Sequence, residues 1–135
     1  MLQSIEQANL DLMKGLLSAF ATRSFSDVGR IISADVELHF PGRNKFSGAY
    51  KGISEAVRLL ALISQWLGDE TRVQVHDVLA NEQHGVMLYV VTARHEDRSI
   101  TYRYVDVYHF RDGCITEIWG QCVDDPAAFD AFYSD

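Results

Sequence analysis

The amino-acid sequence predicts a single α+β domain over residues 1–135, in which N-terminal helices pack on one face of a curved, mostly antiparallel sheet. Amphipathic patterns with helical spacing fill much of the first half of the chain. Over 85–124, long stretches of alternating residues follow one another with tight turns between them, which is typical of a strand meander. Helices followed by a meander indicate the α+β class, because each helix must bury its apolar stripe against the sheet.

Helix signals mark four segments. Ser4 with Gln7 fits a capping box at the start of the first helix, and Gly68 stands where a helix C-terminal glycine is expected. Asp125 followed by Pro126 is an N-cap with proline at the first helical position. The expected helices are 4–22, a short one after Ser24, 53–67, and a last one from Pro126 to Phe132 or Tyr133.

Strand signals surround these helices. The stretches 35–40 and 71–80 alternate apolar and polar residues, and Pro41-Gly42 ends the first of them. Within 85–124, the turn at Glu96–Ser99 and the Asp112-Gly113 dipeptide predict two hairpins. The segment 42–52 has three glycines, and we expect a loop that is mobile or wrapped over a pocket mouth.

Composition excludes several kinds of partner. A net charge of −7 and a pI near 5.1 argue against nucleic acid, because binding phosphates needs clustered Lys and Arg. No apolar run approaches the ~20 residues that span a bilayer, and no signal peptide is visible.

Cys114 and Cys122 lie on one expected strand, about 26 Å apart, so they cannot form a disulfide within the chain. We therefore expect reduced thiols in a cytoplasmic protein.

The order of these pieces resembles the nuclear-transport-factor-2-like superfamily, in its SnoaL-like and ketosteroid-isomerase-like branch. The resemblance covers nearly the whole chain and rests on ISADVELHFPG, SGAYKGISEAV, VHDVLANEQHGVML, VDVYHFRDGCITEIW and DDPAAFDAFYS. It implies a cone-shaped, cystatin-like fold with a hydrophobic pocket in its open end, and members are commonly dimers. Their functions include isomerisation, polyketide-type aldol cyclisation, epoxide hydrolysis and non-catalytic binding, so the fold alone does not name one.

Strand alternation then predicts which residues line the pocket. In the ketosteroid isomerases, an aspartate four residues before a phenylalanine of this strand lines the pocket as an oxyanion-hole acid, and Asp106 stands four before Phe110. The inward residues are then Tyr102, Tyr104, Asp106, Tyr108 and Phe110, with Met87, Tyr89, Val91 and Ala93, with Ile118, Gly120 and Cys122, and with Val36, Leu38 and Phe40. Asp106 would be a carboxyl whose charged form is disfavoured by burial, or a core group that only hydrogen-bonds Tyr89 or Tyr104.

The resemblance also shows departures. Phe40 stands where the isomerases carry their general base, and Leu16 aligns with their oxyanion tyrosine. Gly120 stands where the cyclases and epoxide hydrolases carry an aspartate. His39 is the best replacement base because imidazole titrates near neutral pH, although alternation opposes it, since His39 and Phe40 cannot both face inward unless the strand bulges.

Other residues have simpler interpretations. The five histidines show no ligand spacing with cysteines or carboxylates, so we expect no metal and no cofactor. Tyr50 either leans over the pocket mouth or covers the sheet edge. Trp119 lies on the outward face beside Val105 and Val107, and this face suits a homodimer interface.

The sequence favours two functions about equally. The first is a cofactor-free isomerase, cyclase or hydratase acting on an apolar carbonyl or polycyclic substrate, with Asp106 as acid and His39 as base. The second is a non-catalytic binder of a hydrophobic small molecule, and a dimerisation domain filled by its own tyrosines is a further alternative. The expected ligand-binding residues are Tyr89, Tyr104, Tyr108, Phe40, Leu16, Ile118 and Tyr50.

Overall fold

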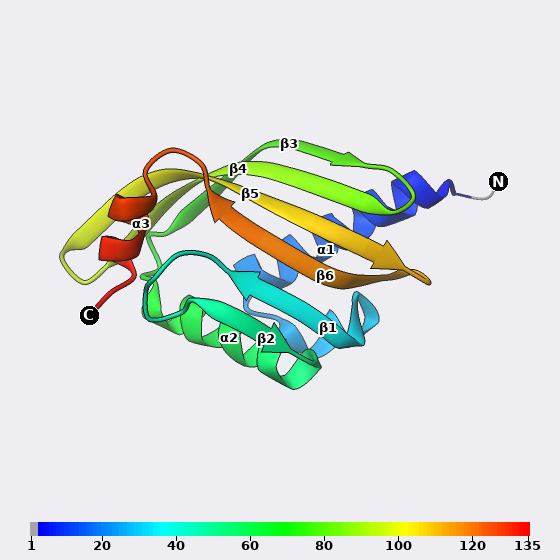
Figure 1. Cartoon of the computed structure of the whole chain (residues 1–135), viewed down its shortest axis with the longest axis horizontal. Helices are drawn as coiled ribbons and strands as arrows, with labels where there is room; N and C mark the ends of the chain where they lie inside the picture. Colours follow the sequence, from blue (N-terminus) through cyan, green and yellow to red (C-terminus); the bar gives the residue numbers. More distant parts are fainter. Residues whose placement is uncertain (1–2) are drawn as a thin grey trace.

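The structure is a computed structural model, and it describes residues 3–135. It confirms the α+β class: six strands form one curved sheet, and the helices lie against it (Figure 1). The helical elements are α1 (Ile5–Thr22), the 3-10 helix η1 (Phe25–Arg30), α2 (Ile53–Trp66) and α3 (Pro126–Phe132). The strands are β1 (Ile32–Phe40), β2 (Gly48–Lys51), β3 (Arg72–Ala80), β4 (His84–His95), β5 (Arg98–Arg111) and β6 (Cys114–Cys122).

The sheet has the strand order β2-β1-β6-β5-β4-β3. The meander predicted over 85–124 is β4, β5 and β6, which pair antiparallel in sequence order, and β3 pairs antiparallel with β4 at the edge of the sheet. β1 joins β6 in parallel, so the first strand of the chain lies beside the last one. This pairing extends the sheet far enough to curve around the helices.

The concave face of the sheet carries the core. Figure 1 shows α1 behind the sheet, α2 beside β1 and β2, and α3 at the end of the sheet where β4 turns into β5. Met13 of α1, Leu59 of α2 and Phe129 of α3 each have 1% or less of their surface exposed. Among the described residues, no helix is long and apolar enough to cross a membrane.

Helix ends follow the sequence signals with one exception. The Ser4 hydroxyl accepts from the backbone N–H of Gln7 at 3.1 Å, and Asp125 accepts from that of Ala128 at 3.1 Å. Gly68 is not a left-handed C-terminal cap, because α2 already ends at Trp66 and the chain continues extended at Leu67. The N–H of Gly68 instead donates to the carbonyl of Arg94 on β4 at 2.7 Å, which ties the segment after α2 to the sheet.

The expected loop over 42–52 contains a strand that sequence reasoning missed. β2 pairs antiparallel with β1 at the edge of the sheet. The turn before it is held to α3, since the side-chain amide of Asn44 donates to Asp130 at 2.8 Å and the backbone N–H of Arg43 donates to the same carboxylate at 3.0 Å. The segment is therefore a fixed edge of the sheet.

A bulge changes the expected faces of β3. The pairing with β4 shifts between Val75 and Asp77, which leaves His76 as the extra residue. Beyond the bulge, Val78 pairs with the buried Met87, so Val78 lies on the inward face, where uninterrupted alternation from Val73 and Val75 would place Asp77. The last part of β3 therefore faces the opposite way from what simple alternation along 71–80 predicts.

Candidate functional site

The sheet and the helices line a partly open cavity of about 140 Å³. Its wall is formed by α1, α2 and the inner face of the sheet, and most of the lining side chains are aliphatic or aromatic. Asp106 is the one carboxylate among the described residues that line it. The cavity is therefore an apolar space with a single acidic group.

Asp106 lies in the middle of β5 and is held by two tyrosines. The hydroxyl of Tyr89, on β4, donates to Oδ2 at 2.7 Å, and the hydroxyl of Tyr108 donates to the same oxygen at 3.1 Å. Sequence reasoning named Tyr89 as a partner, and the second partner is Tyr108 in place of Tyr104. The two hydrogen bonds orient the carboxyl group and leave Oδ1 free to contact a ligand.

Two polar atoms at the cavity have no partner among the described residues. Oδ1 of Asp106 receives no hydrogen bond, and the hydroxyl of Tyr104 makes none. Both atoms keep some accessible surface. Within residues 3–135, the one side-chain oxygen that is fully buried and has no hydrogen-bond partner is that of Ser33. Oδ1 and the Tyr104 hydroxyl are thus the groups that a ligand in the cavity would meet.

Tyr104 also explains the vacant family position at Gly120. A Cβ built on Gly120 would collide with the Tyr104 hydroxyl, so the tyrosine occupies the space that a side chain there would need. Gly120 lies directly opposite Asp106 in the sheet. The place of a second carboxylate is therefore taken by a neutral hydroxyl beside Asp106.

Burial changes the proton affinities in this group. Desolvation raises the pKa of Asp106 to about 6, and the hydrogen bonds from Tyr89 and Tyr108 hold it from rising further. Desolvation, followed by the charge of Asp106, raises the pKa of Tyr104 well above its ordinary value. Asp106 consequently changes charge near neutral pH, while the tyrosine stays a neutral donor.

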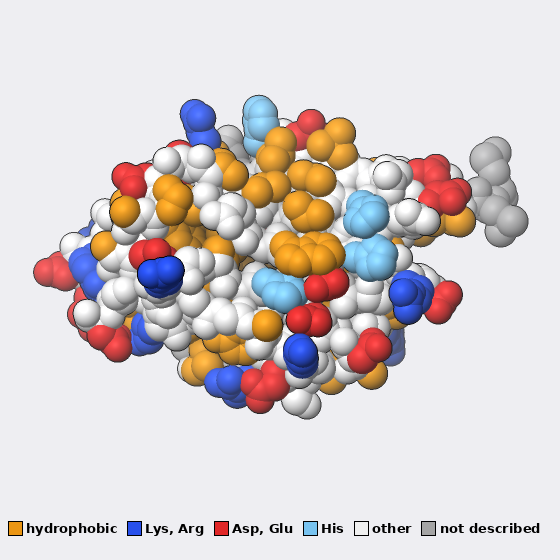
Figure 2. All heavy atoms as spheres, viewed as in Figure 1, with side chains coloured by type: hydrophobic (Ala, Val, Ile, Leu, Met, Phe, Trp, Pro, Cys, Tyr) orange, Lys and Arg blue, Asp and Glu red, His pale blue; other side chains and the backbone are white. Residues whose placement is uncertain are grey.

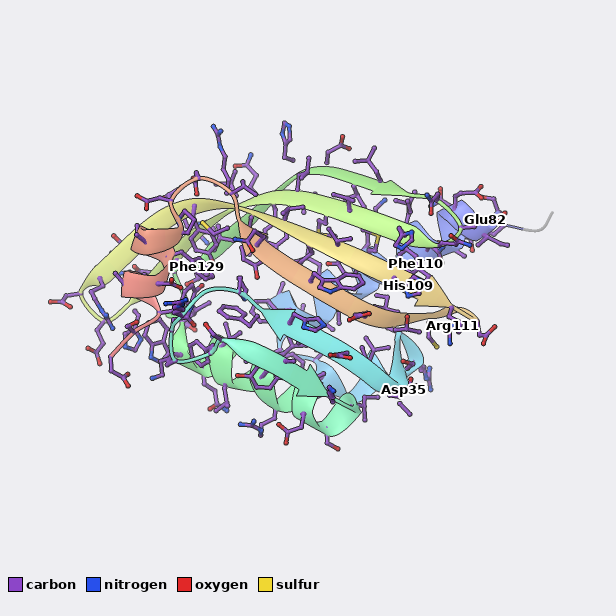
Figure 3. All side chains as sticks on the ribbon, in the orientation of Figure 1. Asp35, Glu82, His109, Phe110, Arg111 and Phe129 are labelled. Carbon is purple, nitrogen blue, oxygen red and sulfur yellow. The ribbon has the colours of Figure 1, made fainter. Side chains whose placement is uncertain are left out.

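A second tyrosine pair closes the cavity at α3. The hydroxyls of Tyr102 and Tyr133 lie 2.6 Å apart and are buried. Phe129 of α3, labelled in Figure 3, packs edge-on against Tyr102 at a centroid distance of 5.0 Å. Because each hydroxyl already has the other as its partner, this pair holds α3 to the sheet.

The structure brings most of the predicted ligand-binding residues to the cavity. Those that line it are Leu16, Phe40, Tyr89, Tyr104, Asp106, Tyr108 and Ile118. Tyr50 is not among them, since it lies on β2, where its hydroxyl donates to the carbonyl of Phe46 at 2.7 Å and its ring lies beside Arg58. Of the two alternatives for Tyr50, the sheet edge is the one that the structure shows.

His39 lies at the cavity wall, but its imidazole is held elsewhere. Nε2 lies 2.8 Å from Oε2 of Glu117, and the ring stacks on Trp119 with an interplanar angle of 3°. In the β1–β6 pairing, Leu38 and Ile118 share the cavity face, which puts His39 and Trp119 on the other face. The structure therefore does not bring His39 together with Asp106.

Some lining residues were not expected from the sequence. They are Leu17 and Phe20 of α1, Leu59, Leu60, Ile63 and Leu67 at α2, Thr71 before β3, Val73 of β3, and Tyr133 after α3. The helical stripe of α1 indicated that Leu17 and Phe20 are buried, but not that they face a cavity. No sequence pattern places Tyr133, because its position depends on how α3 docks.

Comparison with known proteins gives a consistent answer. The family model of the SnoaL-like domain matches residues 13–118. An uncharacterised protein of Mycobacterium tuberculosis H37Rv, Rv0034, is 25% identical over 130 residues, which cover 96% of this chain and 98% of that one.

Two solved structures show the same fold. Bal32a, from a soil-derived mobile gene cassette, superposes with a TM-score of 0.89 at 17% identity, covering 96% of this chain and 99% of its own. A putative SnoaL-like polyketide cyclase from Jannaschia sp. CCS1 gives 0.80 at 18% identity, covering 99% and 96%. These likenesses confirm the predicted resemblance and fold.

The raised pKa of Asp106 predicts a stability that depends on pH. Because the folded state holds this proton more tightly than an unfolded chain, with a pKa of about 6 against 3.8, its contribution is fully present below pH ~4 and is lost as the pH rises through about 6. Relative to wild type, Asp106→Asn should gain about 2.4 kcal/mol between pH 4 and pH 7. Urea unfolding at several pH values measures the difference.

Asp97→Asn is the matched control, since Asp97 is exposed in the turn between β4 and β5. Its stability difference from wild type should stay nearly constant over the same range. If Asp106→Asn and wild type change in parallel, the carboxyl is not desolvated in the folded protein.

Proposed function

We propose that this chain, which belongs to the SnoaL-like domain family, binds a small apolar carbonyl compound in its cavity and polarises the carbonyl with Asp106. The observation that carries the proposal is the pair of unpartnered polar atoms, Asp106 Oδ1 and the Tyr104 hydroxyl, in an otherwise apolar space. A ligand that fits needs an apolar body and one polar group that meets both atoms.

A carbonyl oxygen is the polar group that suits them. When Asp106 is protonated, Oδ1 becomes a donor, and the Tyr104 hydroxyl is a second donor from the same face of β5. Two donors that converge in an apolar cavity stabilise negative charge on an oxygen, as an oxyanion hole does; ketosteroid isomerase, with its neutral aspartic acid, is the known example of this arrangement. The same geometry would serve an enol or enolate.

The ligand itself favours the protonated form of Asp106. In the free protein the pKa of about 6 leaves the carboxyl mostly ionised at neutral pH. An apolar ligand that displaces the remaining water from the cavity disfavours the charge further and raises the pKa. Ligand binding and protonation of Asp106 are therefore coupled.

Cavity size limits the ligand. An apolar cavity of ~150 Å³ engineered in another protein is large enough to bind benzene, and the cavity here has about 140 Å³. A ligand with one six-membered ring therefore fits the present shape. A polycyclic ligand would need Leu17 and Phe20 to move apart from the sheet.

The chemistry that follows is that of a cofactor-free isomerase, cyclase or hydratase. Donation to the carbonyl oxygen withdraws electrons from the neighbouring carbons, which acidifies their protons and favours attack on the carbonyl carbon. The chain shares its fold with a protein described as a putative SnoaL-like polyketide cyclase, which makes carbonyl chemistry the class to test first.

A second function is favoured by the absence of another carboxylate. Phe40 and Gly120 replace the family's bases, and Asp106 is alone among the described acidic residues at the cavity. A cavity with one acid and no base suits a carrier that holds the carbonyl compound without converting it. A purely structural domain fits less well, because the cavity is not filled by its own tyrosines.

Ligand binding should depend on pH in wild type but not in Asp106→Asn. A ketone oxygen only accepts, so 2-cyclohexenone should bind the protonated protein and weaken by roughly 50- to 100-fold between pH 5.5 and pH 8, as a pKa near 6 requires. In Asp106→Asn, the amide oxygen takes the two tyrosine hydrogen bonds and the NH₂ group replaces the protonated Oδ1. Its affinity should be nearly independent of pH; binding is followed by NMR titration.

Cyclohexene is the control ligand, because it has the same ring without the oxygen. Its binding to wild type should weaken with rising pH less than that of the ketone, because it desolvates Asp106 but accepts no hydrogen bond from it. If the ketone and the hydrocarbon show the same pH profile, Asp106 does not contact the ketone.

Proton exchange on the bound ketone distinguishes an enzyme from a non-catalytic carrier. In D₂O near pH 6, Asp106 would donate to the carbonyl oxygen of 2-cyclohexenone while solvent takes up the proton from the neighbouring carbon, and the enol would then regain a deuteron from D₂O. Wild type should accelerate this deuterium incorporation by ~100-fold, within the range of general acid catalysis. Asp106→Asn should still bind but lose at least about tenfold of this rate, because an amide donates a hydrogen bond without transferring the proton. If wild type binds the ketone but exchange proceeds only at the rate seen in buffer, the protein is a carrier and not a catalyst.

We further propose that the outer face of the sheet joins two copies in a homodimer. Figure 2 shows hydrophobic side chains gathered over the middle of this face, with histidines around them. Trp119 is 37% exposed there and lies opposite Val107 in the β5–β6 pairing. An apolar patch with an exposed tryptophan is typical of an interface.

Val107→Glu should break this dimer, since it would place two like charges in an apolar contact. Wild type should sediment with about twice the 15.3 kDa of the chain, and the variant should dimerise at least ~100-fold more weakly. Thr101→Glu adds the same charge to the same face at an exposed place near the other end of β5, and it should stay dimeric. A monomeric wild type at 100 μM would contradict the proposal.

A further inference from the structure

We propose that the outer face of the sheet carries a site for a divalent transition-metal cation of the Zn²⁺ type, formed by Glu37, His39 and Glu117. The three residues each offer one ligand atom, and these atoms all lie within 4.8 Å of one another. This site is separate from the cavity and does not depend on ligand binding there, and it lies beside Trp119 on the same face as the proposed dimer interface.

The parallel pairing of β1 with β6 builds the cluster. Glu37 and Glu117 are Cα partners across the two strands, so their side chains leave the same face of the sheet. His39 follows two residues after Glu37, which returns it to that face. Three potential ligands therefore stand on two adjacent, hydrogen-bonded strands, which are rigid supports for a metal site.

The spacing of the ligand atoms fits a small cation. Nε2 of His39 lies 2.8 Å from Oε2 of Glu117 and 3.5 Å from Oε1 of Glu37. Two ligands bound tetrahedrally to Zn²⁺ at about 2.0–2.2 Å are about 3.4 Å apart. Rotation of the side chains by small amounts would bring all three atoms to that spacing.

The local charge favours a cation. Among the described residues, the ion-pair contacts of Glu37 and Glu117 are to His39 alone. Lys51 lies opposite Glu37 in the β1–β2 pairing but forms no ion pair with it. Two carboxylates thus share one imidazole, and each of the three side chains has only 28–34% of its surface exposed. A bound dication would neutralise both carboxylates.

Trp119 orients the imidazole. The two rings stack with a centroid distance of 5.9 Å and an interplanar angle of 3°, which restricts rotation of the His39 ring. This holds Nε2 toward both carboxylates. A preset ligand loses less freedom when the cation binds.

The ligand types select the class of cation. One imidazole nitrogen with two carboxylate oxygens suits Zn²⁺ and its first-row neighbours, whereas Ca²⁺ and Mg²⁺ prefer oxygen ligands alone. Three protein ligands leave a position for water or another molecule, as in open zinc sites.

Calorimetric titration of the untagged protein with Zn²⁺ at pH 7 tests the site. Wild type should bind one Zn²⁺ per chain, and His39→Ala and Glu117→Gln should each weaken binding at least about tenfold, because even residues behind the ligands cost that much. Glu117→Gln keeps the shape of the side chain, and circular dichroism checks that each variant is folded. His76→Ala is the control, since His76 lies exposed on the bulge of β3.

A nearby histidine pair gives the test its second arm. His84 and His109 stack at 5.0 Å on the same face, and His109 is labelled in Figure 3. If Zn²⁺ binding survives His39→Ala and is lost in His84→Ala, the cation belongs to that pair and the proposal is wrong. No binding by wild type at 100 μM Zn²⁺ also overturns it.

Discussion

The parallel pairing of β1 with β6 is the contact on which both faces of the sheet depend. On the inner face it places Leu38 beside Ile118 and completes the cavity wall. On the outer face the same register places Glu37 beside Glu117. Because successive side chains of a strand leave opposite faces, a shift of one residue in this register would remove both arrangements at once. The two sites are chemically independent but share one structural cause.

At Asp106 the requirements of stability and of function differ. Burying a carboxyl in an apolar wall opposes folding once it ionises, and the tyrosine hydrogen bonds offset only part of that cost. An aliphatic residue would pack there without a charge, but the hydroxyls of Tyr89 and Tyr108 would then lose their acceptor. A group that is poorly tolerated by its surroundings, and yet supported by two neighbours, is typical of a functional position.

Alternation along the strands made the inner face predictable, because one inward residue determines the rest of its strand. The resemblance to the isomerases at Asp106 and Phe110 was enough to assign β5, and the same alignment assigned β4 and β6. The sequence could not indicate β2 or the bulge at His76, since both depend on contacts with a neighbouring strand. The Glu37, His39 and Glu117 cluster was missed for a related reason. Glu37 and His39 do have the spacing of a same-face pair, but Glu117 is 78 residues from His39, and only the parallel register joins them.

The residues at the two positions where the family carries a base, Phe40 and Gly120, are part of the packing. This limits the chemistry that the cavity can perform. Phe40 contacts the rings of Phe46, Phe129 and Tyr133 at centroid distances of 5.6–6.0 Å, so it ties β1 to α3. The Tyr104 hydroxyl occupies the space beside Gly120. A carboxylate at either place would therefore disturb the core or displace a tyrosine, and neither lost base is replaced by a nearby acidic residue at the cavity wall. Whatever proton transfer this cavity performs must begin at Asp106, with Tyr104 as its neutral partner.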